Sequence, residues 1–210
     1  MPLDPVDPSL RAAELRDVDQ MVAIHLQAFP RFFLTILGRR FLVELYHSIL
    51  ADESGVVLVN ATAEKILGFV AGTVAPANFY GRLVRQRWPR FALAALVPAI
   101  RQPSIIPRLL RALRKPAEEP ASPGGALLMS LAVDPAAQRS GIGVRLVAGF
   151  SVACQKRGVD RIRLTTDRAD NAAVNSFYLR NGFRLDRMFT TPEGRTMNEY
   201  VLDLPRQTLG

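Results

Sequence analysis

A loop with two glycines lies between an apolar run and a long helical pattern, and its residue types suit phosphate binding. It reads Gln138-Arg139-Ser140-Gly141-Ile142-Gly143. Two glycines separated by one residue allow backbone N–H groups to approach a phosphate with no Cβ in the way. A helix expected from Gly141 to Arg157 adds unpaired N–H groups and the positive end of its dipole. The segment therefore predicts a pyrophosphate site.

Two common classes of pyrophosphate loop fit this segment poorly. A nucleoside-triphosphate loop has Gly-Lys-Ser/Thr at its end, whereas Val144 and Arg145 follow Gly143 here. A dinucleotide loop has a third glycine where this chain has Leu146, and no paired strand with an acidic end follows in register.

The sequence resembles the GNAT family of N-acetyltransferases at two places. The first is Leu131-Ala132-Val133-Asp134-Pro135 followed by Gln138-x-x-Gly141-x-Gly143, which is similar to the family's acetyl-CoA signature Arg/Gln-x-x-Gly-x-Gly/Ala. The second is Asn171-x-x-Val174-x-x-Phe177-Tyr178-x-x-x-Gly182-Phe183, which is similar to the family's later motif. The resemblance covers 127–204 closely and 10–74 loosely, and it leaves out the segment between them.

This resemblance implies an α/β fold with a mixed, largely antiparallel central sheet flanked by helices. It also implies an enzyme that moves an acetyl group from acetyl-CoA to a primary amine by direct attack. The backbone of Leu131 and Val133 would bind the pantetheine arm, and the Leu131 N–H would polarise the thioester carbonyl. The pyrophosphate would be bound by Gln138, Arg139, Ser140, Gly141, Ile142, Gly143 and Val144.

The later motif would supply two further residues of the site. By the same resemblance, Asn171 would meet the pantetheine and Tyr178 would protonate the departing thiolate. Without the resemblance, this segment reads as a capped amphipathic helix with a tyrosine in the core. Six side chains could accept the proton of the amine, and the pattern selects none of them: Glu14, His25, Glu44, His47, Ser130 and Asp134. Glu44 and His47 share a helix face that we expect to be solvated.

Hydrophobic periodicity predicts the elements that must position these residues, in one domain over residues 1–210. Strands are expected over 9–15, 56–60, 65–74, 127–133, 161–166, 183–189 and 197–204, and helices over 17–29, 37–50, 141–157 and 171–180. Residues 76–125 are interpreted as a basic helical insert that ends in a Pro/Gly-rich linker. Within it, helices are expected over 79–88 and 107–115, with a break at the prolines 89, 98, 103 and 107.

The insert holds most of the chain's positive charge. Nine Lys or Arg and two Glu lie between Pro76 and Gly125, so this segment carries +7 of the net +8. One interpretation is a lid over the acceptor pocket. Another is peripheral contact of 78–115 with anionic lipid, in which Trp88, Phe91 and Leu93 lie beside Arg85, Arg87 and Arg90. No nucleic-acid partner is expected, because no binding motif is present.

Composition restricts the location and the chemistry. The single cysteine, Cys154, allows no internal disulfide, and no metal site is expected. It lies in an apolar helical pattern with no matched partner, so no covalent acyl-enzyme is expected. The N-terminus has no targeting pattern, and the longest apolar run, Phe91 to Ile100, is about half of a membrane span. We therefore expect a cytoplasmic protein.

The acceptor amine stays open. The stretch 28–34 and the basic insert look like GNAT members of cell-surface polysaccharide pathways, which would make an amino-sugar nucleotide the acceptor. A protein N-terminus or a lysine is the alternative acceptor. A non-catalytic module that binds acyl-CoA, or that docks on a membrane, is the competing class of function. The oligomeric state is not predicted.

Overall fold

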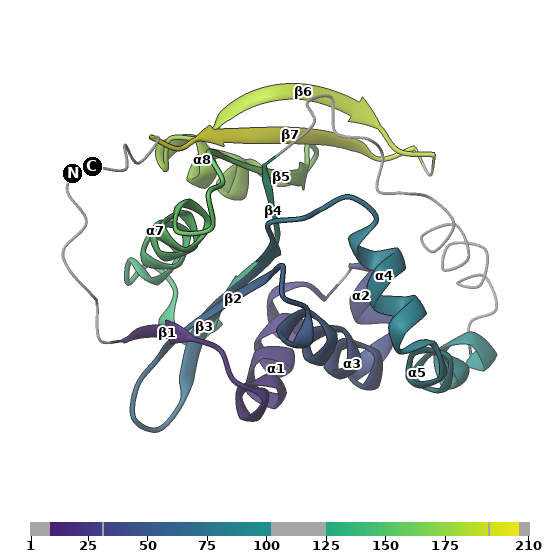
Figure 1. Cartoon of the computed structure of the whole chain (residues 1–210). Coiled ribbons are helices and arrows are strands. Elements are labelled where there is room, and N and C mark those ends of the chain that lie inside the picture. The colour runs from purple at the N-terminus through teal and green to yellow at the C-terminus, as the bar shows by residue number, and fades with distance from the viewer. Residues whose placement is uncertain (1–8, 31, 102–124, 193, 206–210) are drawn as a thin grey trace.

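A seven-stranded sheet runs through the described part of the protein, with helices on both faces (Figure 1). The computed structural model describes residues 9–30, 32–101, 125–192 and 194–205. The strands are β1 (Leu10–Ala12), β2 (Gly55–Ala61), β3 (Ile66–Thr73), β4 (Ala126–Val133), β5 (Arg161–Asp167), β6 (Arg184–Thr190) and β7 (Thr196–Asp203). Their order in the sheet is β1-β2-β3-β4-β5-β7-β6, and only the pair β4–β5 is parallel.

Two helical layers sandwich the sheet. The helices are α1 (Val18–Ala28), α2 (Phe33–Ile36), α3 (Gly38–Ala51), α4 (Phe79–Gln86), α5 (Trp88–Arg101), α7 (Ile142–Gln155) and α8 (Ala172–Arg180), with short 3-10 turns η1 (Leu15–Asp17) and η2 (Pro135–Ala137). Alternate residues of a strand face opposite sides, so Phe69 joins the core under α1 and α3, while Val70 joins the core under α7. The expected α/β fold with a mixed, largely antiparallel sheet is confirmed.

The insert differs from its expectation, because α5 runs through two prolines that were expected to break it. Pro89 lies in the first turn, where no N–H is needed. Pro98 lies inside the helix and costs about 3 kcal/mol there. Packing offsets this cost: Phe91 is buried with its ring 5.2 Å from that of Phe41 on α3, and Ala94 and Ala95 are buried behind it. The helix expected over 107–115 and the linker lie outside the described residues.

The N-terminal region also departs from expectation. The strand expected over 9–15 ends at Ala12, because the Asp17 carboxylate turns the chain. Asp17 accepts hydrogen bonds from the Arg11 guanidinium at 2.6 and 2.9 Å and from the Glu14 N–H at 2.7 Å. The short helix α2 was not expected. No helix in the described ranges is long and apolar enough to span a bilayer.

Candidate active site

The two central strands separate soon after they meet. β4 and β5 pair only through Ala126 with Ile162 and Leu127 with Arg163. Directly after this, the register of β3 with β4 shifts between Ala71 and Gly72, which leaves Met129 as an extra residue on β4. Such a bulge bends a strand and increases its twist. From Leu128 onward, the edge of β4 that faces β5 therefore has no strand partner in the described sheet.

The hydrogen-bond pattern shows which backbone groups lie on this open edge. The Asp134 N–H donates to the Leu67 carbonyl at 2.8 Å, and the strand register pairs Ala132 with Phe69. The backbone N–H and C=O groups of successive residues in an antiparallel strand point to opposite edges. Those of Ala132 therefore bond to β3, and those of Leu131 and Val133 point away from β3. Consistently, the Ala132 carbonyl oxygen lies 2.9 Å from where a Cβ on Gly68 would stand. The N–H and C=O groups of Leu131 and Val133 thus face the opening.

The glycine loop leads into α7 beside this opening. Gly141 has φ +79° and precedes the first helical residue, Ile142, and no described side chain caps the helix. The first-turn N–H groups are therefore available to an anion. Gln138, Arg139 and Ser140 are exposed, and the Ser140 hydroxyl donates to the Ala137 carbonyl at 2.6 Å.

The two glycines of the loop serve different needs. A positive φ favours glycine at position 141, where a Cβ would have space. At position 143 a Cβ would lie 3.2 Å from the Phe177 ring, so Gly143 allows α7 to approach α8. The expectation that both glycines only clear space for a phosphate was therefore incomplete.

Tyr178 lies in the core between α8 and the sheet. It is buried, and its ring contacts those of Phe177, Phe183 and Tyr200. No described residue hydrogen-bonds to its hydroxyl. This oxygen is not fully enclosed by the protein. Burial raises the pKa of Tyr178, so the phenol stays protonated over the physiological range.

Asn171 has a structural task in addition to the role that the resemblance implies. Its Nδ2 donates to the Asp167 carbonyl at 3.1 Å, and the Asn175 Nδ2 donates to the same oxygen at 3.2 Å. The Thr166 hydroxyl completes the link by donating to the Asn175 Oδ1 at 2.6 Å. These bonds fix the end of β5 to the start of α8. Asn175 was missed in the sequence, although its spacing of four from Asn171 puts both on one helix face.

Two of the six candidate bases, His25 and Ser130, lie near Tyr46 on the other face of β4. His25 Nδ1 lies 2.7 Å from the Tyr46 hydroxyl, which also interacts with the Ser130 side chain. Burial lowers the pKa of His25 to about 4, so its imidazole is neutral at physiological pH. Burial also raises the pKa of Tyr46. Ser130 directly precedes Leu131, so this buried polar chain ends beside the open edge.

Two other candidate bases are engaged in local structure. Asp134 accepts from the Ala136 N–H at 2.9 Å and lies 3.6 Å from the Lys65 ammonium. Glu14 pairs with Arg16 at 3.0 Å. Among the residues that the structure describes, no group of three His, Cys, Asp or Glu could hold a metal ion.

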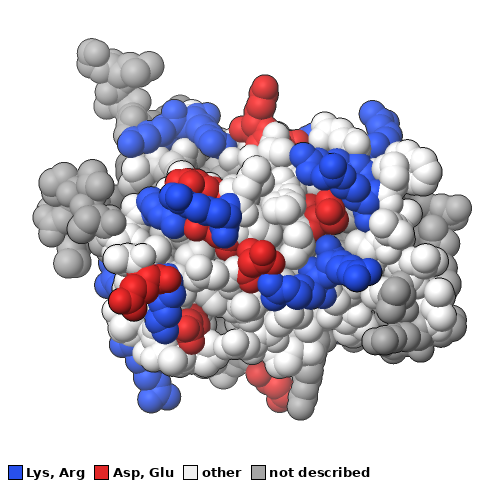
Figure 2. Space-filling view, turned by 90° about the horizontal axis from the view of Figure 1, so that it is seen from below, with Lys and Arg blue, Asp and Glu red and all other residues white. Residues whose placement is uncertain are grey.

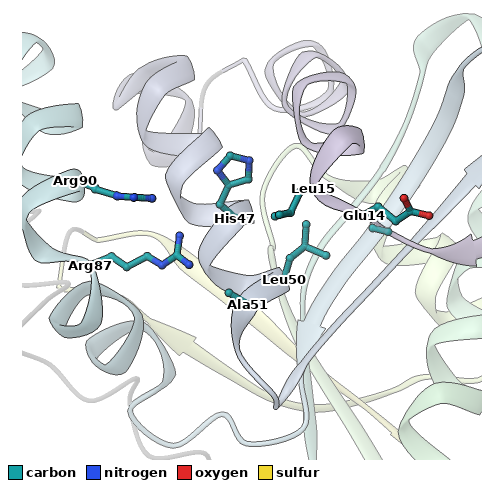
Figure 3. Close-up of a pocket in the computed structure, with 8 residues that line it drawn as sticks. Glu14, Leu15, His47, Leu50, Ala51, Arg87 and Arg90 are labelled. Atoms are coloured by element: carbon teal, nitrogen blue, oxygen red, sulfur yellow. The ribbon is translucent and has the colours of Figure 1, made fainter.

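His47 lines a separate groove of about 620 Å³. In Figure 3, Arg87 and Arg90 extend toward the helix that carries His47, Leu50 and Ala51. Residues 13–15, which lead from β1 into η1, close the other side. The expectation of a solvated face for Glu44 and His47 was wrong for Glu44, whose Oε2 is buried. The groove belongs to the α1/α3 layer, so the sheet separates it from α7 and the glycine loop.

Comparison with known proteins gives one family and many related folds. The model of the acetyltransferase (GNAT) family matches residues 18–183. The ribosomal-protein-S18-alanine N-acetyltransferase from Escherichia coli has a similar structure (TM-score 0.57, 16% identity, 96% of each chain). An aminoglycoside 6′-acetyltransferase type Ii is also similar (TM-score 0.60, 14% identity, 94% of this chain and 99% of that one). At such identities these two likenesses show a shared fold.

A curated relative covers a shorter stretch. The chain is 36% identical over 59 residues to the uncharacterised protein YxbD of Bacillus subtilis (strain 168). This match spans 28% of the chain and about a third (36%) of that protein. None of these three proteins supports the polysaccharide-pathway subtype that the stretch 28–34 and the basic insert suggested.

Proposed function

Because the chain belongs to the acetyltransferase (GNAT) family, we propose that it transfers the acetyl group of acetyl-CoA to a primary amine by direct attack. The observation that carries this proposal is the open edge of β4. There the backbone groups of Leu131 and Val133 face the opening between β4 and β5 and have no strand partner among the described residues. An extended pantetheine arm, with two amides of its own, can pair with these groups as a short added strand would.

The loop at the start of α7 is assigned to the pyrophosphate. Its uncapped N–H groups and the positive end of the helix dipole favour a negatively charged group. We assign Gln138, Arg139, Ser140, Gly141, Ile142, Gly143 and Val144 to this site. Asn171 is assigned to the pantetheine, because the bonds of Asn171 and Asn175 hold the start of α8 beside β5.

Acetyl-CoA supplies a thioester whose carbonyl carbon is open to an amine nucleophile. The Leu131 N–H would polarise the carbonyl oxygen where negative charge develops. Tyr178 would donate the hydroxyl proton to the leaving sulfur, and its raised pKa keeps that proton available. With the cofactor on the α7 side, the amine is left to approach from the side of Ser130. The proton that the amine loses passes to solvent, because burial lowers the pKa of His25 to about 4 and its imidazole does not hold that proton.

The acceptor is a primary amine, and three arms of one assay separate its classes. The names of the structural neighbours indicate a protein amine and an aminoglycoside as acceptors of those proteins. An amino-sugar nucleotide is the third arm. Its diphosphate was expected to meet the insert's arginines, but Arg82 is engaged with the carbonyls of Ala75 and Ala77.

The test is release of free thiol from acetyl-CoA in the presence of each amine, with mass spectrometry of the amine. Amine-dependent thiol release together with an acetylated amine supports the proposal. Acetyl-CoA binding without transfer to any amine would indicate a non-catalytic acyl-CoA-binding module. Absence of acetyl-CoA binding would refute the site assignment as well.

A further inference from the structure

The outward face of α5 is apolar and exposed to solvent. Trp88 is 64% exposed, and Leu93 and Ile100 are each 70% exposed. Leu96 is also exposed, and Leu93, Leu96 and Ile100 follow the spacing of one helix face. The opposite side of the helix packs against α3. α5 therefore has two apolar sides, of which only the inner one has a partner among the described residues.

Cationic side chains border this exposed face. The sequence from Phe79 to Arg101 contains five arginines and no Asp or Glu. Arg85 and Arg90 are exposed, and their guanidinium groups form no ion pair or hydrogen bond with a described residue. Arg90 precedes Leu93 by three residues, so it lies between the apolar face and the groove beside His47, toward which its side chain extends (Figure 3). Charge and apolar surface are thus adjacent on α4 and α5.

Phe91 differs from the sequence-based interpretation of this surface, and Arg82 of the same insert is engaged elsewhere. The Arg82 guanidinium donates to three oxygen atoms and lies over the Phe79 ring at 5.4 Å, so it holds the chain before α4. Phe91 is buried against Phe41 and is not available to a partner. The surface is therefore formed by Leu93, Leu96 and Ile100. Trp88 is exposed at the start of α5, with Arg85 three residues before it on α4 and Arg90 two residues after it.

We propose that this α5 face binds the surface of an anionic lipid bilayer. An exposed helix face with aliphatic side chains can insert at the boundary between headgroups and acyl chains. Tryptophan prefers that interface, and arginine pairs well with phosphate. Charge complementarity selects the anionic headgroup, since α4 and α5 carry no carboxylate side chain.

A nucleic acid is a poorer match for this side of the molecule. Figure 2 shows Lys and Arg interspersed with Asp and Glu and separated by neutral surface, without one continuous basic field. A nucleic-acid backbone needs a row of cations along its length. A bilayer needs only local cations around an apolar face, which α5 supplies.

Trp88 is the only tryptophan of the chain, so its emission reports on the exposed start of α5. The full chain is titrated with phosphatidylcholine vesicles with and without phosphatidylserine. We expect a blue shift, protection from acrylamide and co-sedimentation only with phosphatidylserine. Arg85→Gln with Arg90→Gln should weaken binding about 30-fold, at roughly fivefold per charge. Leu93→Gln with Ile100→Gln should weaken it with unchanged salt dependence.

The control variant carries Arg168→Gln and Arg180→Gln, which remove the same charge from exposed positions outside α4 and α5. It should bind vesicles more tightly than the Arg85/Arg90 variant. Equal loss in both variants would mean that net charge alone acts, and would overturn the proposal. So would a Trp88 already protected in dilute lipid-free protein, or a blue shift that follows protein concentration without lipid and so reports a second copy. The proposal does not depend on the acetyl-transfer assay.

Discussion

Val144→Asp tests the pyrophosphate assignment without disturbing the apo fold. Val144 is 49% exposed and lies in the first turn of α7. An aspartate there stabilises the helix by about 0.3–1 kcal/mol, because its negative charge lies near the positive end of the helix dipole. Replacing either loop glycine is a poorer choice. A side chain at position 143 would contact the Phe177 ring, and a residue other than glycine at position 141 would be strained by the positive φ. The variant therefore adds a charge to the proposed site and leaves the packing intact.

The expected effect follows from Coulomb's law and mass action. A carboxylate about 6 Å from a phosphate charge costs nearly 3 kcal/mol at an effective dielectric constant of about 20. Half-exposure reduces this to about 2 kcal/mol, which weakens acetyl-CoA binding ~30-fold. At about 100 Kd, ligand binding raises the wild-type free energy of unfolding by ~2.7 kcal/mol and Tm by about 5–11 °C. At the same concentration the variant keeps about 0.9 kcal/mol, or about 2–4 °C.

The assay is thermal unfolding with and without acetyl-CoA, with calorimetric titration for Kd. Leu185→Asp is the matched control, because Leu185 is 44% exposed and lies on the edge strand β6. It adds the same charge away from the loop and should keep the full ligand-induced shift. A full shift in Val144→Asp, with apo Tm unchanged, would refute the placement of the pyrophosphate at α7.

Three further predictions concern single side chains. Tyr178→Phe should lower kcat by ~10²–10⁴ with little change in acetyl-CoA affinity, measured by thiol release and titration; a wild-type kcat would return Tyr178 to a purely structural role. His25→Gln should flatten the stability profile below pH 6.5. The lowered pKa of His25 makes the wild type lose up to ~3 kcal/mol as pH falls from 6.5 to 4, and urea unfolding at several pH values measures it. Arg82→Gln should lower the free energy of unfolding by roughly 1 kcal/mol, and Arg85→Gln should leave it unchanged; equal values would contradict the assigned contacts of Arg82.

The loop and its flanking elements could be predicted because their signals are local. The apolar run before Asp134, the glycine at 141 and the helical spacing after it are all contained in one short segment. The open edge at Leu131 was accessible only through resemblance, since it depends on the register of β4 with strands that are distant in sequence. Pro98 and Phe91 show the same limit. Whether Pro98 is tolerated in a helix and whether Phe91 is buried both depend on the packing of α5 against Phe41, about 50 residues earlier.

The lipid surface and the cofactor site are proposed on opposite sides of the sheet, so the two can be occupied together. α5 packs on α3 through Phe91 and Phe41, and α3 also carries Tyr46 toward Ser130 on β4. The glycine loop opens into α7, which packs on the other face. A bilayer against α5 would leave acetyl-CoA access unobstructed, because the sheet lies between them. It would also hold the helical layer on the Ser130 side, so docking can influence the amine side of the reaction without touching the cofactor.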